Sequence, residues 1–317
     1  MGHRRRSPST PRTDAPSASA PRAHVSPGGT PAAGDEADRR ELAAVADDVA
    51  ATWRLALGPP FPGGTASWVT PARDEAGRDL VLKIARTHDE ARDEAAGLLA
   101  WQGRGAVTVH RTVVDGATTV LLLDRCRPGT PLAAAASAEE ADEVIAALVR
   151  TLWIVPPPGS PFRPLAEMCD QWAGSAAARL GHDAHGLPAE MVEAGLDLFR
   201  RLPRDPVEPV LLATDLHHLN VLAVDEATTG PSRGPCGWRL IDPKPYVGDP
   251  HYDLLQQALN APDRLAADPI GLIDRMAHLT GLDRDRARTW LFARCVQEAG
   301  AWDGLAEAAI TLARVVL

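Results

Sequence analysis

The chain has 317 residues, which is enough for one large domain or for two lobes with separate hydrophobic cores. Apolar residues make up 45% of it, an ordinary share for a globular protein, and no apolar run reaches the roughly 20 residues that cross a membrane, so we expect no membrane association. The four cysteines are widely spaced, without a Cys-x-x-Cys pair, which disfavours a zinc site or redox pair and fits a protein of the reducing cytoplasm.

The net charge of −9 is unevenly distributed along the chain. Residues 1–30 contain five arginines and one aspartate, a net charge of +4, so the remainder carries −13. An acidic body disfavours nonspecific binding to nucleic acid and suits a cationic partner or substrate. For most of these carboxylates, however, a solvated surface without a binding role is the simpler interpretation.

The first part of the chain is predicted to be a disordered tail followed by a small lobe. Residues 1–36 are rich in Pro, Ser, Ala, Gly and Arg and lack apolar periodicity, which is typical of disorder. Residues 38–57 place apolar side chains every three or four positions and predict a helix. Strands are expected at 61–69, with a glycine turn inside, and at 79–85, 107–110 and 118–124, with a helix at 88–101. An antiparallel sheet with one inserted helix indicates an N-terminal lobe at residues 37–126.

After residue 127 the pattern becomes mostly helical and indicates a larger C-terminal lobe, residues 127–317. Helices are expected at 137–153, 164–180, 188–202, 250–260, 270–280 and within 283–316. A loop between two short strands is expected within 211–224, and another strand at 238–241. Asp249 is predicted to cap the helix that Pro250 begins, and Asp253 to hydrogen-bond back to that loop. The predicted fold class is therefore α+β, with two lobes.

Three segments contain side chains suited to phosphoryl transfer. Lys83 ends the apolar run Leu-Val-Leu-Lys, Asp215 precedes Asn220 by five residues, and Asp242 follows an apolar strand. Transfer of a phosphoryl group from Mg-ATP needs a cation on the phosphates, oxygen ligands for Mg²⁺ and a carboxylate at the attacking hydroxyl. Each residue also has a simpler interpretation, as a snorkelling lysine, a turn aspartate, a capping asparagine or a strand-ending aspartate. Together, and in this order, they favour a phosphotransferase.

Further residues are candidates for contact with the nucleotide. Glu90 and Glu94 lie four residues apart on one face of the predicted helix, so either can pair with Lys83, and Glu94, which lies deeper in the helix, is preferred. Gly63 and Gly64 would let backbone amides approach phosphates, although a plain hairpin turn explains them equally well. Backbone groups between the lobes would pair with an adenine edge, in the segment from Asp124 to Cys126.

The substrate would be contacted by the C-terminal lobe. Glu298 and Trp302 stand one helical turn apart, and a carboxylate beside an aromatic face suits a cationic sugar, although an ordinary amphipathic helix is an alternative. His217 and His218 are adjacent and point in different directions in any regular element. We therefore expect one of them to be packed and the other, which we take to be His217, to face the substrate.

The order of these segments resembles the aminoglycoside phosphotransferase superfamily, which has a protein-kinase-like fold, and within it the group of streptomycin 6-kinases and hydroxyurea phosphotransferases. The resemblance covers residues 40–317, and its most specific motifs are Thr-Asp-Leu-His-x-x-Asn-Val-Leu at 214–222 and Ile-Asp-Pro-Lys-Pro-x-x-Gly-Asp-Pro at 241–250. Weaker matches are Leu-Val-Leu-Lys at 80–83, Glu-Ala at 94–95, Leu-Leu-Leu-Asp-Arg at 121–125 and Pro-Gly-Thr-Pro-Leu at 128–132. Ala213 stands where kinase-like enzymes commonly carry a histidine, a departure that weakens the match little.

The resemblance implies an ATP-dependent phosphotransferase that inactivates an aminoglycoside such as streptomycin, or hydroxyurea, as a monomer or weak dimer. It places Lys83, held by its pairing with Glu94, on the ATP phosphates, Asp215 as the catalytic base, Asn220 and Asp242 on Mg²⁺, and Glu298 and Asp303 near the substrate. Because the body of the chain is acidic, we prefer cationic streptomycin over neutral hydroxyurea as the substrate.

Three alternatives stay open. A kinase of another small metabolite, such as a sugar or an amino alcohol, would use the same residues. A catalytically inactive nucleotide-binding homologue is disfavoured, because none of the four residues assigned to phosphoryl transfer is missing. Nucleic-acid binding through the arginine-rich tail would be sensitive to salt and would depend on residues 1–36.

Overall fold

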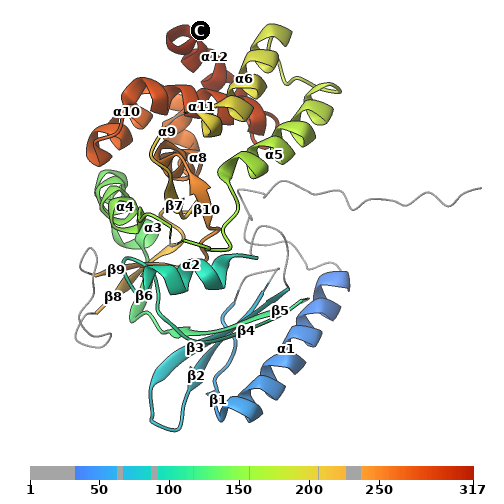
Figure 1. Cartoon of the computed structure of the whole chain (residues 1–317), viewed down its shortest axis with the longest axis vertical. Helices are drawn as coiled ribbons and strands as arrows, with labels where there is room; N and C mark the ends of the chain where they lie inside the picture. Colours follow the sequence, from blue (N-terminus) through green and yellow to red (C-terminus); the bar gives the residue numbers. More distant parts are fainter. Residues whose placement is uncertain are drawn as a thin grey trace, which may run out of the picture.

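The protein folds into two stacked lobes, as a computed structural model shows (Figure 1). The structure describes residues 33–62, 67–86, 92–116, 118–156, 158–205, 207–225 and 237–317. The smaller lobe is an antiparallel sheet covered by a helix, and the larger lobe is mostly helical, so the expected α+β class with two lobes is confirmed. Within the described ranges, no helix is both long and apolar enough to cross a membrane.

Five antiparallel strands form the sheet of the smaller lobe, in the order β1-β2-β3-β5-β4. They span Ala56–Leu57 (β1), Ser67–Arg73 (β2), Asp79–Arg86 (β3), Val109–Asp115 (β4) and Thr118–Asp124 (β5). Helix α1 (Ala33–Trp53) lies across one face of the sheet, and α2 (Glu94–Trp101) lies between the sheet and the larger lobe (Figure 1). The glycine turn expected at Gly63 and Gly64, and residues 87–91 before α2, lie outside the described part of the chain.

Strand alternation separates the two faces of this sheet. Leu82 and Ile84 of β3 pack with Leu42 of α1 in the smaller hydrophobic core. Lys83, which lies between them in sequence, therefore points to the opposite face, where α2 lies. The apolar residues of β5 divide between the two cores in the same way. The alternation of side chains along β3 thus directs Lys83 toward α2, between the lobes.

Some element boundaries differ from those expected. The first helix ends at Trp53, because Arg54 adopts a left-handed conformation with a φ of 56° and the chain continues into β1. β2 extends to Arg73 through Pro71, a residue without a backbone donor, which makes this strand hard to recognise from sequence. β4 starts later and runs further than the strand expected at 107–110.

Two small antiparallel sheets support the loops of the larger lobe. One contains β6 (Pro128–Pro131), β8 (Val221–Val224) and β9 (Trp238–Leu240), and the other contains β7 (Val210–Leu212) and β10 (Tyr246–Gly248). β7 and β8 flank the loop at 213–220, and β9 and β10 flank the segment at 241–245. The expected strands around the first loop and before the second segment are present, whereas β6 and β10 are short, contain proline or glycine, and were not expected.

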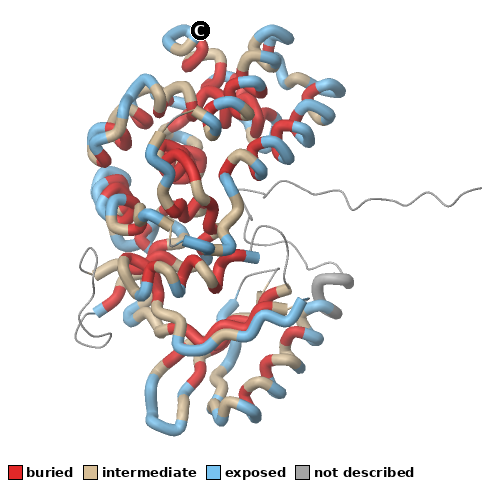
Figure 2. The backbone as a smooth tube through the Cα atoms, viewed as in Figure 1, coloured by how far each residue is buried: buried red, intermediate tan, exposed pale blue. Residues whose placement is uncertain are grey.

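Helices make up most of the larger lobe: α3 (Leu132–Ala135), α4 (Ala138–Leu152), α5 (Leu165–Leu180), α6 (Ala189–Arg201), α8 (Leu255–Leu259), α9 (Pro262–Ala267), α10 (Pro269–Thr280), α11 (Arg284–Glu298) and α12 (Leu305–Val316), with the 3-10 helices η1 (Leu202–Arg204) and η2 (Pro250–Leu254). α11 is buried on all sides from Trp290 to Glu298, so it is the central helix of this lobe. Figure 2 shows that buried backbone gathers where these helices meet. Trp290 contacts Phe199 and Tyr252 edge to face, with ring centroids 6.1 and 5.3 Å apart.

The cap expected at Asp249 is present. Asp249 accepts a hydrogen bond from the backbone N–H of His251, and Pro250 is the first residue of η2. The same carboxylate accepts hydrogen bonds from Arg286 Nε and Trp290 Nε1, both at 2.6 Å. Asp249 therefore fixes α11 against the start of η2 as well as capping it.

Gly195 lets α6 approach α11 closely, because a Cβ at this position would lie 2.6 Å from a side-chain carbon of Val296. We expect Gly195→Ala to lower the free energy of unfolding by about 1–3 kcal/mol, since overpacking outweighs the gain in helix propensity. Gly174→Ala on α5 is the matched control, because nothing lies within 4 Å of its Cβ, and it should raise the stability by roughly 0.5–1 kcal/mol. Urea unfolding measures both effects, and a stabilising Gly195→Ala would contradict the close contact.

Candidate active site

The loop at 213–220 carries Asp215 and is held by one buried carboxylate. Asp253 of η2 accepts hydrogen bonds from the backbone N–H groups of Ala213 at 3.1 Å and Thr214 at 2.8 Å, and from Trp153 Nε1 at 3.0 Å. The expected bond from Asp253 to this loop is therefore confirmed. Burial raises the pKa of Asp253 to about 6, while the three donors act in the opposite direction.

Two residues of the site have an uncommon backbone conformation. Thr214 and Asp242 have φ values of 48° and 53°, a region that a β-branched residue such as threonine rarely adopts. Neighbouring bonds hold Thr214 in place: its hydroxyl donates to the carbonyl of Lys244, and the N–H of Lys244 donates to the carbonyl of Ala213 at 2.9 Å. Strain that the surrounding structure maintains is typical of functional sites.

Lys83 forms the ion pair with Glu94 that the sequence favours. Its Nζ lies 2.7 and 2.8 Å from the two carboxylate oxygens of Glu94 and 2.7 Å from Oδ1 of Asp242. Burial acts to lower the pKa of Lys83, but the two carboxylates outweigh it and the pKa is raised. Burial raises the pKa of Glu94. Burial also acts to raise the pKa of Asp242, but the charge of Lys83 outweighs it, so the pKa of Asp242 is lowered.

Close packing fixes α2 beside this cluster. Gly97 of α2 faces Pro245, whose Cγ would lie 2.3 Å from a Cβ at position 97, so a larger residue would push the helix away. Just before α2, Asp93 accepts a hydrogen bond from Arg163 Nε at 2.9 Å, and the guanidinium of Arg163 lies over the ring of Tyr246, 4.6 Å from its centroid. α2 is thus attached to the larger lobe on both sides of Glu94.

Asp215 lies next to two basic side chains. Its Oδ2 is 3.0 Å from Nζ of Lys244, and its Oδ1 is 3.6 Å from Nε2 of His217. Asn220 donates from its amide nitrogen to the backbone carbonyl of Asp215 at 3.1 Å, which leaves its amide oxygen as an acceptor. The backbone N–H of Ile241 donates to the carbonyl of Asn220 at 2.9 Å and joins this loop to the segment that carries Asp242.

The donor set at the site suits Mg-ATP. Asn220 offers an amide oxygen, and Asp242 offers a carboxylate whose side chain is 49% exposed; Mg²⁺ prefers such oxygen ligands. Lys83 contacts Asp242 directly, so phosphates held by Lys83 and a metal ion held by Asp242 would lie next to each other.

The segment between the lobes has the position expected for an adenine contact. The N–H of Asp124 donates to the carbonyl of Thr108 at 3.0 Å, and its carboxylate pairs with Nε2 of His110 at 2.5 Å. Cys126 follows and is partly buried. The adenine contact at Asp124 and Cys126, and the phosphate contact at the glycines outside the described residues, stay predictions.

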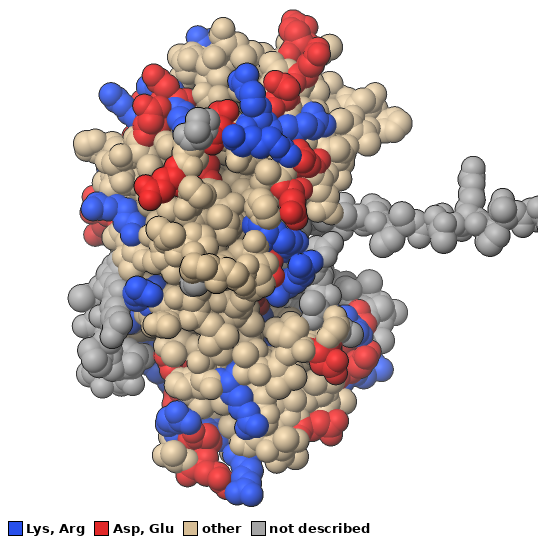
Figure 3. Space-filling view, in the orientation of Figure 1, with Lys and Arg blue, Asp and Glu red and all other residues tan. Residues whose placement is uncertain are grey.

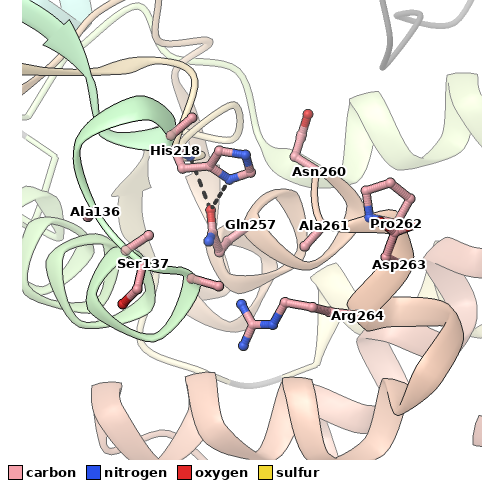
Figure 4. Close-up of a pocket in the computed structure, with 12 residues that line it drawn as sticks. Ala136, Ser137, His218, Gln257, Asn260, Ala261, Pro262, Asp263 and Arg264 are labelled. Atoms are coloured by element: carbon pink, nitrogen blue, oxygen red, sulfur yellow. Dashed lines mark hydrogen bonds between the residues drawn. The ribbon is translucent and has the colours of Figure 1, made fainter.

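The two adjacent histidines have different surroundings. His217, which we expected to face the substrate, is buried, and its pKa is lowered to about 4, mainly by burial. His218 instead lines a cavity of about 250 Å³ between α3, α4, α8 and α9 (Figure 4). The packed histidine is therefore His217, because the turn of the 213–220 loop directs its ring inward beside Asp215.

Figure 4 shows the two contacts between His218 and Gln257 at this cavity, and Asp142 joins Gln257 and Arg264 beside it. The amide oxygen of Gln257 lies 3.1 Å from both the backbone nitrogen and Nδ1 of His218, and its nitrogen donates to Asp142 at 3.2 Å. Arg264 donates to the two oxygens of Asp142 at 3.0 and 2.7 Å. This network ties the 213–220 loop to α4 and α9, so its role is structural.

The expected pairing of Glu298 with Trp302 on one helix is wrong. α11 ends at Glu298, and Gly300 and Gly304 adopt φ values of 90° and 102°, which take the chain out of the helix. Trp302 is half-buried and Asp303 is exposed in the resulting turn.

Glu298 also has a different partner from the one expected. Its carboxylate is buried and accepts a hydrogen bond from Arg294, one helical turn earlier. The Arg294 guanidinium lies over the ring of Trp172, 4.8 Å from its centroid. Because Arg294 neutralises Glu298, this carboxylate no longer offers an unpaired negative charge to a cationic substrate.

Lys244 is a site residue to which the sequence analysis assigns no role. A simple count would have indicated it: the chain has 31 arginines but only two lysines, Lys83 and Lys244. Both lie in this site, each within 3.0 Å of a carboxylate assigned to catalysis or to the metal.

The outer surface gives no sign of a large acidic patch on the face shown in Figure 3. Basic and acidic side chains are interspersed there, and much of the middle is uncharged. On this face, the acidic excess of the chain is therefore not gathered into one patch that would attract a cationic partner.

Comparison with known proteins identifies related chains. The family described as aminoglycoside/hydroxyurea antibiotic resistance kinase matches residues 52–305. A hydroxyurea phosphotransferase of Kitasatospora aureofaciens is 33% identical over 84% of this chain and 76% of its own length. A streptomycin 6-kinase of Streptomyces glaucescens is 29% identical over 87% of this chain and 89% of its own length. An aminoglycoside phosphotransferase of Streptomyces rimosus, solved in complex with ADP and streptomycin, matches with a TM-score of 0.52 and 21% identity over 81% of this chain and 98% of that one, a likeness of fold.

His217 should make the protein sensitive to acid. Its pKa falls from 6.5 to about 4 on folding, so between these values the unfolded chain binds more protons and stability falls as the pH falls. We expect the wild type to lose about 2 kcal/mol more unfolding free energy than His217→Asn between pH 7 and pH 5. Urea unfolding without nucleotide or Mg²⁺ measures this, and asparagine can keep the acceptor for the N–H of Leu219. The same pH dependence in both proteins would show that folding does not lower the pKa of His217.

Proposed function

Because the chain belongs to the aminoglycoside/hydroxyurea antibiotic resistance kinase family, we propose that it transfers the γ-phosphoryl group of ATP to a hydroxyl group of a small-molecule antibiotic. The observation that carries the proposal is the convergence of Lys83, Asp215 and Asp242, which come from three separate segments. Lys83 pairs with Asp242, and the N–H of Ile241 joins the segment of Asp242 to the loop of Asp215. A phosphorylated antibiotic carries additional charge and bulk, so its cellular target would bind it poorly.

The proposed reaction uses the side chains in distinct roles. Asp215 accepts the proton of the acceptor hydroxyl as its oxygen bonds to the γ-phosphorus, and the bond from that phosphorus to the β-phosphate oxygen breaks to release ADP. Lys83, held by Glu94, binds phosphate oxygens. Asn220 and Asp242 would hold Mg²⁺, which neutralises phosphate charge when bound. Asp253 keeps the loop of Asp215 in place through its backbone.

Streptomycin and hydroxyurea are the acceptors that the proposal favours, since the curated relatives are a streptomycin 6-kinase and a hydroxyurea phosphotransferase. The acidic composition of the chain supports the cationic streptomycin. The pairing of Glu298 with Arg294 supports the neutral hydroxyurea, because it removes a charge that would attract a cation. We propose a small molecule of one of these two kinds as the substrate, and a monomer or weak dimer in the cytoplasm as the acting form.

The first experiment is ADP release from Mg-ATP with streptomycin, other aminoglycosides and hydroxyurea. We expect release that depends on one of these drugs, and we expect Asp215→Ala to lower turnover by a factor of about 10² to 10⁴ while ATP binding stays near normal, because only the proton acceptor is lost. Asp47→Ala, an exposed carboxylate on α1, is the control and should keep full turnover. Unchanged turnover in Asp215→Ala would rule out Asp215 as the base, and no release with any drug would exclude these acceptors.

The role of Asp242 can be separated from that of Asp215 by varying the metal. We expect Asp242→Ala to abolish activity at ordinary Mg²⁺ concentrations, because it removes a charged oxygen ligand. Activity that rises again at much higher Mg²⁺ would support the ligand role, and the measurement is turnover against Mg²⁺ concentration for both proteins. Full activity at ordinary Mg²⁺ would place the metal elsewhere.

A further inference from the structure

The chain has only two lysines, against 31 arginines. Ion pairs that join helices use arginine, as in Arg264 with Asp142 and Arg286 with Asp249. Arginine suits such pairs because its planar guanidinium binds carboxylates with two parallel donors, whereas the compact ammonium of lysine is a mobile point charge. Both lysines of the chain instead lie beside carboxylates assigned to the metal or to catalysis.

Lys244 lies beside the carboxylate proposed as the catalytic base. Its Nζ is 3.0 Å from Oδ2 of Asp215, and the side chains of Lys244 and Asp215 are 24% and 20% exposed, so both are partly accessible to solvent. Lys83, by contrast, is 8% exposed and enclosed by Glu94 and Asp242. The charge of Lys244 also acts to lower the pKa values of Asp242 and Glu94, although burial raises the pKa of Glu94 overall.

A purely structural role for the Lys244 side chain is not needed. The backbone of Lys244 already joins its segment to the 213–220 loop, through its N–H to Ala213 and its carbonyl from Thr214. Asp253 holds the same two residues from the other side. A nucleotide phosphate that entered the site would compete with Asp215 for the ammonium group.

We infer that Lys244 is a second phosphate-binding lysine, which binds the γ-phosphoryl group of ATP beside Asp215 and stays with that group during its transfer. The inference rests on the proposed function and deepens it. Charge on the transferred group is spread over its three outer oxygens, and a preorganised ammonium stabilises it there. The γ-phosphorus bonds to the acceptor oxygen, and its bond to the β-phosphate oxygen breaks. The ammonium of Lys244 stays in contact with the phosphoryl group, which is now part of the product, and Asp215 holds the proton.

The test compares two nucleotides that differ only at the γ-phosphate. Dissociation constants of Mg-ADP and of a non-hydrolysable β,γ-imido analogue of Mg-ATP are measured for the wild type, Lys244→Met, Lys244→Arg and Lys83→Met. We expect Lys244→Met to weaken the ATP analogue by about 10- to 100-fold and ADP by less than about twofold, as one charge-assisted contact is lost. Lys244→Arg should restore part of the loss, whereas Lys83→Met should weaken both nucleotides.

A measurement on the unmodified protein covers the case in which Lys244→Met does not fold. Because the chain has only two lysines, labelling with an amine-specific reagent and mass spectrometry reports each of them separately. We expect the ATP analogue to protect Lys244 more strongly than ADP does, and both nucleotides to protect Lys83.

The outcomes separate this inference from the proposed function. Suppose that the wild type phosphorylates a drug, that Lys244→Met weakens the binding of both nucleotides equally or of neither, and that both nucleotides protect Lys244 from labelling equally. The inference is then wrong, and the proposed function stands. If the wild type binds neither nucleotide, the proposed function fails and the inference fails with it.

Discussion

The ammonium group of Lys83 joins residues of both lobes in one charged cluster. It comes from the sheet of the smaller lobe and binds one carboxylate from α2 and one from the segment after β9. A buried lysine requires such partners, because an unpaired charge in the interior costs several kcal/mol. The close approach of Gly97 to Pro245 keeps both carboxylates within reach, so packing at the back of α2 and charge pairing at its start depend on each other.

The loop that carries Asp215 is positioned by backbone atoms and not by its own reactive side chains. Asp253 binds two of its N–H groups, the carbonyl and N–H of Lys244 bind two further groups, and the carbonyl of Asn220 is bound from the segment before Asp242. These bonds maintain an otherwise unfavourable φ at Thr214. As a result, Asp215 and Lys244 are held close enough to form their ion pair.

Charge in this protein has a structural use that net charge does not reveal. Carboxylates such as Asp142, Asp249 and Glu298 are buried and neutralised by arginines from other helices or from the same helix. They contribute to the acidic total but attract nothing from solvent. An acidic composition is therefore a weak argument for a cationic substrate, and the local pairing of each carboxylate is a stronger one.

The sequence by itself determined the motifs, their order and the periodicity that directs each side chain. It was sufficient for the fold class, the strand that carries Lys83, its pairing with Glu94, the cap at Asp249 and the bond from Asp253. It was not sufficient for the choice between His217 and His218, the end of α11, the neutralisation of Glu298 or the contact of Lys244 with Asp215. The first group follows from spacing within one element or from short motifs. The second depends on how segments pack, as in the contact of Lys83 with Asp242 across 159 residues, and packing is decided only when the whole chain has folded.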